Sequence, residues 1–260
     1  MSASPEPSLA TIALIGAGRL GGVLAGALHH AGFAVQGPFG REDRIPASDI
    51  ALLCVPDAEI PAAAAKARPH ATLVGHVSGA TNLDDVDFSI HPLQTFTGAE
   101  APDVFHGIGA AVAGRTPEAL RTATRLADAL GAHPFTVDDV HRATYHAAAS
   151  LASNLVLTVL DAAEQVALAA GIRDPRTLLA PLVARTVDNW TRDGAAVALT
   201  GPIARGDDAT VQRQQDAVSA ATPGLIPLFD QLCTSTRDLA ATDRRAAADP
   251  GAATDRVAAA

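Results

Sequence analysis

The feature that most constrains this chain is a glycine pattern placed between an apolar run and a helix-forming segment. Residues 11–15 are uncharged and mostly apolar, and an alanine- and leucine-rich stretch follows the glycines. This order predicts a strand, a tight turn and a helix whose free N–H groups and positive end attract an anion. Gly16 would permit the turn, Gly18 would let the backbone approach a pyrophosphate, and Gly21 would let the helix pack closely on the strand. We therefore predict a dinucleotide-binding turn formed by Gly16, Gly18, Arg19, Leu20 and Gly21.

After this turn the sequence alternates between apolar runs and helix-forming segments up to residue 137. Further strands are expected at 33–36, 50–55, 72–77, 88–90, 109–112 and 133–137, with helices at 60–68 and 117–130. Such alternation favours a doubly wound, mostly parallel sheet, and so an α/β Rossmann fold. We expect a dinucleotide-binding domain over residues 9–137, preceded by a flexible N-terminus at 1–8.

The pattern changes at Asp138-Asp139, because no further helix breaker occurs before Gly171. A helix of about thirty residues would be about 45 Å long, which is too long for one layer of a compact sheet domain. The sequence therefore predicts a second, all-α domain over residues 138–242 and a flexible tail at 243–260. Its later helices are expected to begin at Asp174-Pro175, Asp207 and Thr222-Pro223.

Composition excludes several classes of protein. An apolar content of 48% is too high for a disordered chain. The net charge of -9 argues against a nucleic-acid partner, which would favour clustered basic residues. Two well-separated cysteines and an N-terminus without a basic segment suggest a reduced, cytoplasmic protein.

Membrane and metal sites are also disfavoured by the sequence. Residues 143–160 form an uncharged run at the lower length limit of a spanning helix, but the run contains several polar side chains, including His146 and Asn154. His29 and His30 are adjacent rather than on one helical face, and no His-x-x-x-His with a carboxylate partner occurs. We expect neither a membrane span nor a bound metal.

The residues after the second expected strand bear on the choice of coenzyme. An acidic residue that binds the adenosine ribose would stand near Gln36-Gly37, where none occurs, whereas Arg41 and Arg44 follow. An arginine can accept a 2′-phosphate, so Arg41 favours NADP(H). Glu42 and Asp43 keep NAD(H) open as the second choice. Because ligands of open parallel sheets bind at the carboxyl ends of the strands, the expected walls of the site are Val55-Pro56 and Ser78-Gly79.

Polar residues in the long helical segment suggest where chemistry occurs. His146, Ser150 and Asn154 recur every four positions in an apolar background and should share one stripe. Buried polar groups require partners, so this stripe should meet a polar surface or a cleft. His91 follows a strand end and could reach the same cleft, and Arg205 could clamp a substrate carboxylate.

Taken together, several segments resemble a bacterial family that joins a Rossmann-like domain to a helical domain of unassigned function. The resemblance rests on Gly16–Gly21, Cys54–Asp57, His76–Ala80, His91–Phe96, Tyr145–Asn154 and Leu199–Asp207, in this order. That family resembles a branch of the 6-phosphogluconate dehydrogenase-like superfamily, whose members use NAD(P) on small hydroxy, keto or imino acids. Some relatives are described as alternative ketopantoate reductases, in pantothenate biosynthesis. The resemblance implies a 6-phosphogluconate dehydrogenase C-terminal-like helical domain and a homodimer built through it.

The chain departs from this superfamily at one position. The hydroxyacid dehydrogenases carry a lysine and, four residues later, an asparagine that face the substrate from the long helix. If Asn154 matches that asparagine, Ser150 stands where the lysine would be, and Lys66 lies in the sheet domain. A histidine is the natural replacement as proton donor near neutral pH.

These observations lead to one leading hypothesis and two alternatives. The first is an NADPH-dependent reductase of a small 2-keto acid, with ketopantoate as the preferred substrate and a homodimer as the assembly. His146 is the first choice of general acid and His91 the second, Asn154 would orient the carbonyl, and the substrate would contact Ser78, Gly79, Ser150 and Arg205. An imine reductase resembling pyrroline-carboxylate reductase is the second hypothesis, because an iminium arrives already protonated. A non-catalytic NADP(H)-binding sensor or scaffold is the third.

Overall fold

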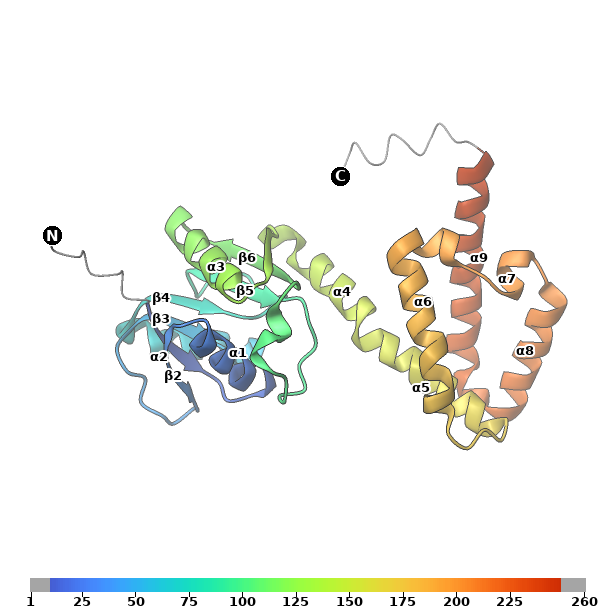
Figure 1. Cartoon of the computed structure of the whole chain (residues 1–260), viewed down its shortest axis with the longest axis horizontal. Coiled ribbons are helices and arrows are strands. Elements are labelled where there is room, and N and C mark those ends of the chain that lie inside the picture. The colour runs from blue at the N-terminus through green and yellow to red at the C-terminus, as the bar shows by residue number, and fades with distance from the viewer. Residues whose placement is uncertain (1–9, 249–260) are drawn as a thin grey trace. The chain divides into compact units, whose positions relative to one another are not determined.

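The computed structural model describes residues 10–248, and for 243–248 only the backbone. Within this range the chain forms two compact units, the first ending at Asn154 and the second starting at Leu155 (Figure 1). The expected flexible N-terminus at 1–8 and residues 249–260 of the expected tail at 243–260 lie outside the described residues.

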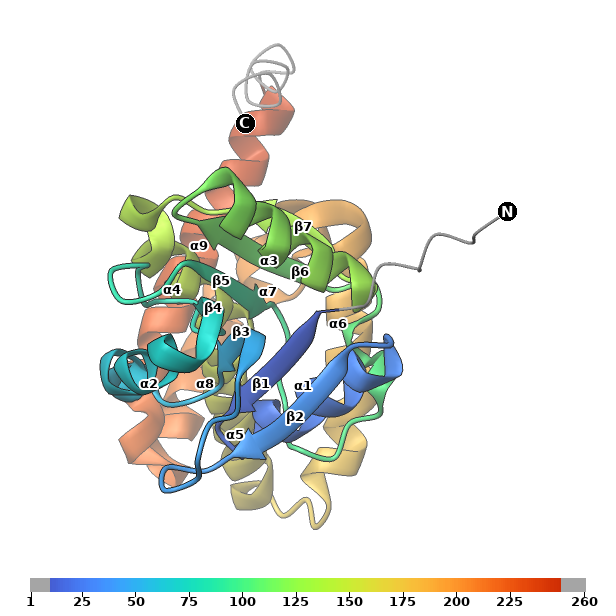
Figure 2. The same ribbon diagram turned by 90° about the vertical axis from the view of Figure 1, so that its left-hand side faces the viewer.

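The first unit contains a seven-stranded sheet in the order β2-β1-β3-β4-β5-β6-β7 (Figure 2). Neighbouring strands are parallel except β5 and β6, which are antiparallel. The predicted α/β fold with a mostly parallel sheet is therefore confirmed. The strands are β1 (Thr11–Ile15), β2 (Ala34–Phe39), β3 (Ser48–Leu53), β4 (Ala71–His76), β5 (Phe88–Pro92), β6 (Gly109–Gly114) and β7 (His133–Thr136).

Helices cover both faces of this sheet, as the apolar strands require. Alternate residues of β1 point to opposite faces: Ile12 and Leu14 join the core beneath α1 (Arg19–His30) and α3 (Pro117–Ala129). Ala13 and Ile15 join a second core beneath α2 (Ile60–Ala67). Burial of both faces explains why the central strands read as continuous apolar runs rather than as alternating patterns.

The strand order fixes where a ligand can enter. From β1 the chain first crosses to β2 on one side, and it then returns to β3 on the other side. The helices that follow β1 and β3 thus diverge at the carboxyl ends of these two strands, which opens a crevice there. The turn at Gly16 follows β1 and the segment Cys54–Pro56 follows β3, so both predicted coenzyme-binding segments lie at this crevice.

The second unit is helical, as predicted. Asp174 caps α6 by accepting a hydrogen bond from the Thr177 N–H (3.4 Å), and Asp207 caps α8 by accepting one from the Thr210 N–H (3.0 Å). Both caps stand where the sequence placed helix starts. The helices are α5 (Asn154–Ala169), α6 (Pro175–Ala198), α7 (Pro202–Arg205), α8 (Asp208–Ala221) and α9 (Ile226–Ala248), and the 3-10 turn η5 (Pro223–Leu225) precedes α9.

The expected single helix from 138 to 171 is instead interrupted. A 3-10 turn, η4 (Asp139–His141), leads into α4 (Arg142–Ala152), which ends before Ser153, where the backbone is not helical (φ -130°, ψ -83°). The Ser153 hydroxyl donates to the Ala149 carbonyl (2.7 Å), a local bond of the kind that bends helices. Because Asn154 starts the next helix, the expectation that His146, Ser150 and Asn154 lie on one continuous helical stripe was wrong.

Two other boundaries differ from the expected ones. The division between the units falls at Asn154 rather than at residue 138, because α4 is tied to the sheet by contacts described below. At the other end, α9 continues through residues 243–248, which the sequence assigned to a flexible tail. Within α6, Gly194 has φ +76° and ψ 165°, which interrupts the helix before it resumes to Ala198.

Candidate functional site

The turn after β1 has the geometry that the glycine pattern predicts. Gly16 has φ +109°, and a Cβ there would lie 2.2 Å from the Cys54 carbonyl oxygen. A Cβ on Gly21 would lie 1.9 Å from the Gly16 carbonyl oxygen, so only glycine lets α1 pack this closely on the turn. At Gly18, by contrast, a Cβ would meet nothing within 4 Å. The structure therefore leaves open space beside Gly18, as an approaching ligand would require.

The N-terminus of α1 faces this space, and no side chain among the described residues caps it. Gly18 is the N-cap residue and provides no side-chain hydrogen bond. The first-turn N–H groups, which belong to Arg19, Leu20 and Gly21, therefore keep the positive end of the helix dipole available to an anion. Neither Arg19 nor Leu20 has a side chain lining the adjacent cavity, so their predicted part in binding rests on their backbone.

A cavity of about 500 Å³ opens in front of this turn. Val55 and Pro56 line one wall, as expected for the segment after β3, and Phe39 and Arg41 line the end near β2. A glycine turn, an uncapped helix N-terminus and a cavity of this size are the combination that a dinucleotide diphosphate requires. The residues present fit such a coenzyme.

Side-chain contacts hold the loop near the end of β2. The Asp43 carboxylate accepts a hydrogen bond from the Gly40 N–H (2.7 Å), so Asp43 is used within the loop rather than directed at a ribose. Arg41 donates to the Glu59 carboxylate (2.6 Å), and the Lys66 ammonium donates to the carbonyls of Arg41 (2.5 Å) and Asp43 (2.9 Å). The predicted phosphate ligand Arg41 is thus already paired with a carboxylate that lines the same cavity.

A cluster of imidazoles lies at the same carboxyl edge of the sheet. His91, near the end of β5, and His146, on α4, have ring centroids 5.8 Å apart in an edge-on arrangement. Gly79, in the turn after β4, is pressed against both rings: a Cβ there would lie 2.8 Å from carbon atoms of each. The structure therefore brings together three predicted site residues from three separate segments, all within the first unit.

Tyr145 fixes the orientation of His91. Its hydroxyl oxygen lies 2.7 Å from Nδ1 of His91, and the tautomer of the ring decides which of the two groups donates this hydrogen bond. Burial raises the pKa of Tyr145 to about 12, which keeps it protonated.

His91 is held in its neutral form. Burial lowers the pKa of His91 to about 4, and the nearby His146 and Arg142 act in the same direction, while Asp57 opposes them. At neutral pH the ring is therefore uncharged and serves as a fixed hydrogen-bonding group. His146 is half-buried beside it on α4.

Arg142 anchors α4 to the sheet. Only 3% of this arginine is exposed, and its guanidinium donates to the Ser89 hydroxyl on β5 (2.8 Å) and to the Asp139 carboxylate (2.6 Å). These contacts tie the first turn of α4 to β5, the strand that carries His91. They explain why α4 belongs to the first unit and why His146 faces His91.

A buried histidine organises the turn that carries Gly79. His76 is fully buried: its Nε2 donates to the Asn82 carbonyl (3.0 Å) and its Nδ1 accepts from the Ser78 N–H (3.2 Å). Burial lowers the pKa of His76, so the neutral ring is favoured. The Ser78 hydroxyl accepts hydrogen bonds from the N–H groups of Ala80 and Thr81, so its oxygen holds the turn.

The remaining predicted residues follow this cluster in the sequence. Ser150 is half-buried further along α4, and Asn154 begins α5, where its side chain is exposed. Arg205 lies at the end of α7 in the second unit, with an exposed side chain. The roles of these three residues stay predictions.

Sequence reasoning missed Tyr145, Glu59 and Lys66. Tyr145 had one available signal: it is the sole tyrosine and directly precedes His146. Glu59 and Lys66 carried no motif, since their contacts depend on how α2 packs beside the loop after β2.

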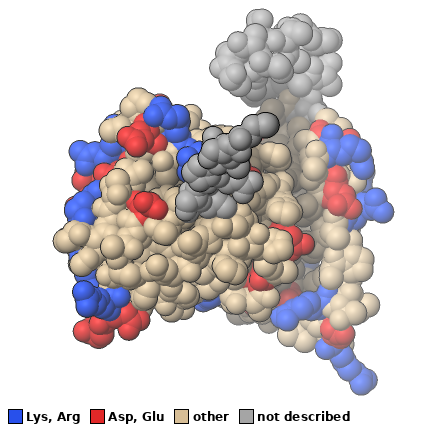
Figure 3. Space-filling model, turned by 60° about the vertical axis from the view of Figure 1, so that its left-hand side comes forward, with Lys and Arg blue, Asp and Glu red and all other residues tan. Residues whose placement is uncertain are grey.

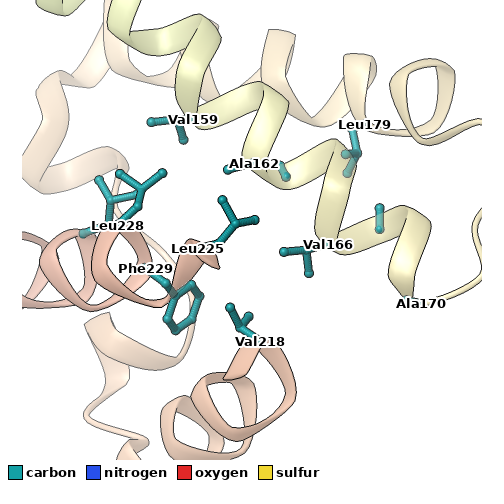
Figure 4. Close-up of a pocket in the computed structure, with 12 residues that line it drawn as sticks. Val159, Ala162, Val166, Ala170, Leu179, Val218, Leu225, Leu228 and Phe229 are labelled. Atoms are coloured by element: carbon teal, nitrogen blue, oxygen red, sulfur yellow. The ribbon is translucent and has the colours of Figure 1, made fainter. Parts of the chain in front are cut away.

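A second cavity, of about 370 Å³, lies within the second unit between α5, α6, α8 and α9 (Figure 4). Its lining residues are all apolar, and Val159, Val166, Val218 and Phe229 point toward one another across it. Because none of the described side chains that line this cavity is polar, it is not a candidate for the chemistry.

Two further observations concern metals and membranes. Among residues 10–248, no group of three or more His, Cys, Asp or Glu side chains is arranged to hold a metal ion. Residues 139–169, taken as one helix, contain an 18-residue window with a mean hydropathy of 1.3, and by length and composition alone this helix could cross a membrane. The break at Ser153 and the polar contacts of α4 fall within this stretch.

Residues 108–236 match the domain of unknown function DUF2520. This match starts beside β6 and extends into α9, so it includes η4 and α4, with Arg142, Tyr145 and His146. No protein of curated function matches the sequence.

Solved structures share the fold over nearly the whole chain. A Bacteroides fragilis protein described as a candidate NADP oxidoreductase has a TM-score of 0.74 and 21% identity, over 89% of this chain and 99% of that one. A Thermotoga maritima protein has a TM-score of 0.73 and 20% identity, over 90% and 99%. The Myxococcus stipitatus imine reductase in complex with NADP+ has a TM-score of 0.56 and 15% identity, over 91% and 94%. The combination of a Rossmann-like sheet with a helical C-terminal part is thereby confirmed.

Proposed function

We propose that this protein is an NADPH-dependent reductase of a small 2-keto acid, with ketopantoate as the preferred substrate. One observation carries the proposal: a single edge of the sheet combines an uncapped helix N-terminus and its cavity with a pair of imidazoles. The first part suits a dinucleotide, and the second suits proton transfer. The solved oxidoreductases of the same fold support this reading.

Residues of the first unit would hold the coenzyme along this edge. The turn of Gly16 and Gly18 and the first-turn N–H groups of α1 would bind the diphosphate. Arg41 would contact the 2′-phosphate, and Val55 and Pro56 would border the nicotinamide. When bound, NADPH would supply the hydride for the substrate carbonyl. NAD(H) is the second choice of coenzyme, because Glu59 stands beside Arg41.

His146 would protonate the carbonyl oxygen as negative charge develops on it. His91 has too low a pKa to carry this proton at neutral pH, so its part is to orient substrate as a neutral hydrogen-bonding ring. Asn154 would help to orient the carbonyl. Ser78, Gly79, Ser150 and Arg205 would complete the substrate site, with Arg205 as partner of the carboxylate.

Imine reduction is the second candidate, and the lysine content of the chain favours it. The sole lysine, Lys66, donates to two loop carbonyls beside the adenosine end of the cavity. An iminium substrate arrives already protonated, so its reduction does not need a lysine in the substrate site as proton donor. A cyclic imine is therefore the second substrate class to test.

The direct test measures coenzyme binding and turnover separately. Binding is measured from NADPH fluorescence, and turnover from NADPH oxidation with ketopantoate, other 2-keto acids and cyclic imines. We expect micromolar binding and the fastest turnover with ketopantoate. Faster turnover of cyclic imines would favour the second candidate, and tight binding without any turnover would indicate the third hypothesis, a sensor or scaffold. No binding of either coenzyme would refute the proposal.

Two glycine variants isolate the coenzyme turn. Gly18→Ala places a methyl group in open space beside the cavity, so the fold should persist while NADPH binding weakens at least about tenfold. Gly22→Ala is the matched control, since it lies one turn further along α1 and also meets nothing within 4 Å. Equal binding by the two variants would contradict the assignment.

A histidine variant tests the chemistry. His146→Gln should lower turnover by about a hundredfold or more, because general acid catalysis typically contributes that much, and should leave NADPH binding intact. Unchanged turnover would remove His146 from the mechanism.

We further propose that the protein acts as a homodimer built through the second unit. Exposed fractions reach 66% for Leu178, 63% for Leu182 and 57% for Trp190, all on α6, and such apolar surface marks an interface. Leu182→Glu should yield monomers in analytical ultracentrifugation. Val140→Glu, at a residue 84% exposed in the first unit, is the control and should leave the dimer intact. A monomeric wild-type protein would refute this assembly.

The proposed setting is the cytoplasm, without membrane or nucleic-acid partners. On the face drawn in Figure 3, basic and acidic side chains intermingle and form no basic patch. A nucleic acid would require such a patch. Membrane fractionation of expressing cells tests the location, because a spanning helix would place the protein in the pellet.

A further inference from the structure

The adenosine end of the coenzyme cavity contains opposed charges. Its charged lining residues are Arg41, Glu59 and Lys66. Arg41 and Glu59 form an ion pair at 2.6 Å, with side chains 75% and 41% exposed. The cavity therefore offers two cations to a ligand, and one of them is already neutralised by a carboxylate.

Lys66 has a position that serves both the loop and the ligand. It extends from the last turn of α2, and two of its N–H groups are used by the carbonyls of Arg41 and Asp43. An ammonium group has three donors, so one N–H remains on a residue that lines the cavity. Lys66 thus fixes the backbone of Arg41 and brings a second positive charge to the same end.

Glu59 acts against an anionic ligand at this position. A 2′-phosphate near Arg41 would compete with the Glu59 carboxylate for the guanidinium and would be repelled by it. A 2′-hydroxyl would instead find an acceptor in that carboxylate. The same residue therefore disfavours a 2′-phosphate and favours an unmodified ribose.

We propose that Lys66 and Glu59 are specificity-determining residues that act in opposite directions, Lys66 favouring a 2′-phosphorylated adenosine and Glu59 favouring the 2′-hydroxyl form. This inference rests on the proposed function, because it assumes that adenosine binds at this end of the cavity. Lys66 and Glu59 would thus act together with Arg41 on the choice of coenzyme, Lys66 toward the phosphorylated form and Glu59 away from it.

The test uses adenosine fragments, whose binding does not depend on catalysis. Dissociation constants for adenosine 2′,5′-bisphosphate and AMP are measured by calorimetry, and those for NADPH and NADH by fluorescence. Lys66→Met should weaken the bisphosphate about tenfold and AMP by less than about threefold, since one charge contact is lost. Glu59→Gln should tighten the bisphosphate several-fold and weaken AMP. Glu118→Gln, at an exposed residue on α3 outside the cavity, controls for the overall change of charge.

Each outcome separates the inference from the proposed function. If the wild-type protein binds NADPH but both variants keep its ratio of bisphosphate to AMP affinity, the inference is overturned and the proposed function stands. If the wild-type protein binds neither coenzyme, both fail. Lys66→Arg keeps the positive charge and should restore the ratio of bisphosphate to AMP affinity that Lys66→Met changes. If Lys66→Arg does not restore this ratio, and Glu59→Gln does not change it either, the inference is overturned and Lys66 only supports the loop.

Discussion

Replacement of His91 by glutamine should change how the stability of the first unit responds to pH. Glutamine carries no titratable group and still offers a polar partner to the Tyr145 hydroxyl. In the native protein the pKa of His91 is lowered to about 4 from the ordinary 6.5, chiefly by burial. The folded state therefore binds fewer protons than the unfolded state between these two values, and stability falls as the pH is lowered through this window.

The size of the effect follows from the shift. This lowering of the pKa of His91 corresponds to a loss of roughly 3 kcal/mol in the free energy of unfolding between pH 7 and pH 4. About 2 kcal/mol of this loss occur by pH 5. The contribution of His91 to the free energy of unfolding is fully present above pH 6.5 and is lost below about pH 4. His76 shifts in the same direction, and carboxylates titrate at the lower end, so only the difference between wild type and variant reports on His91.

The measurement must follow the first unit alone. Hydrogen exchange of the peptide that spans β5, recorded by mass spectrometry in moderate urea and corrected for intrinsic rates, gives the opening free energy at each pH. The wild-type curve should fall more steeply than that of His91→Gln between pH 7 and pH 5. Parallel curves, or an NMR titration of His91 near pH 6.5, would refute the reasoning that its ring is buried and neutral.

Three further predictions concern other parts of the first unit. Gly16→Ala should prevent folding or lower the free energy of unfolding by more than about 2 kcal/mol, because φ is +109° and the Cys54 carbonyl oxygen lies 2.2 Å from the new Cβ. Thermal unfolding measures this change, and a decrease below about 1 kcal/mol would contradict the prediction. Gly79→Ala should displace the two imidazoles and reduce turnover more than NADPH binding, which steady-state kinetics and fluorescence compare; normal turnover would show that the rings are free to move. Thr116→Ala should cost about 1 kcal/mol in urea unfolding, because the hydroxyl caps α3 by accepting from the Ala119 N–H (3.1 Å), whereas Thr116→Ser should cost little.

Local sequence determined the elements and the glycine turn, because the forces that set them act over a few residues. Gly16 and Gly21 are required by backbone clashes within one strand–turn–helix unit, so their pattern was readable. The caps at Asp174 and Asp207 were readable for the same reason. Continuous apolar runs indicated strands covered on both faces, and their alternation with helices indicated the parallel sheet.

The tertiary structure alone decided which polar residues meet. Tyr145, His91 and Gly79 come together because Arg142 ties α4 to β5, and no periodicity in the sequence encodes that contact. The same holds for Glu59 and Lys66, which reach the loop of Arg41 only because α2 packs beside it. Contacts between distant segments depend on the packing of whole elements, so residue types and spacing could name His91 and His146 as candidates for one cleft but could not show that their rings are in contact.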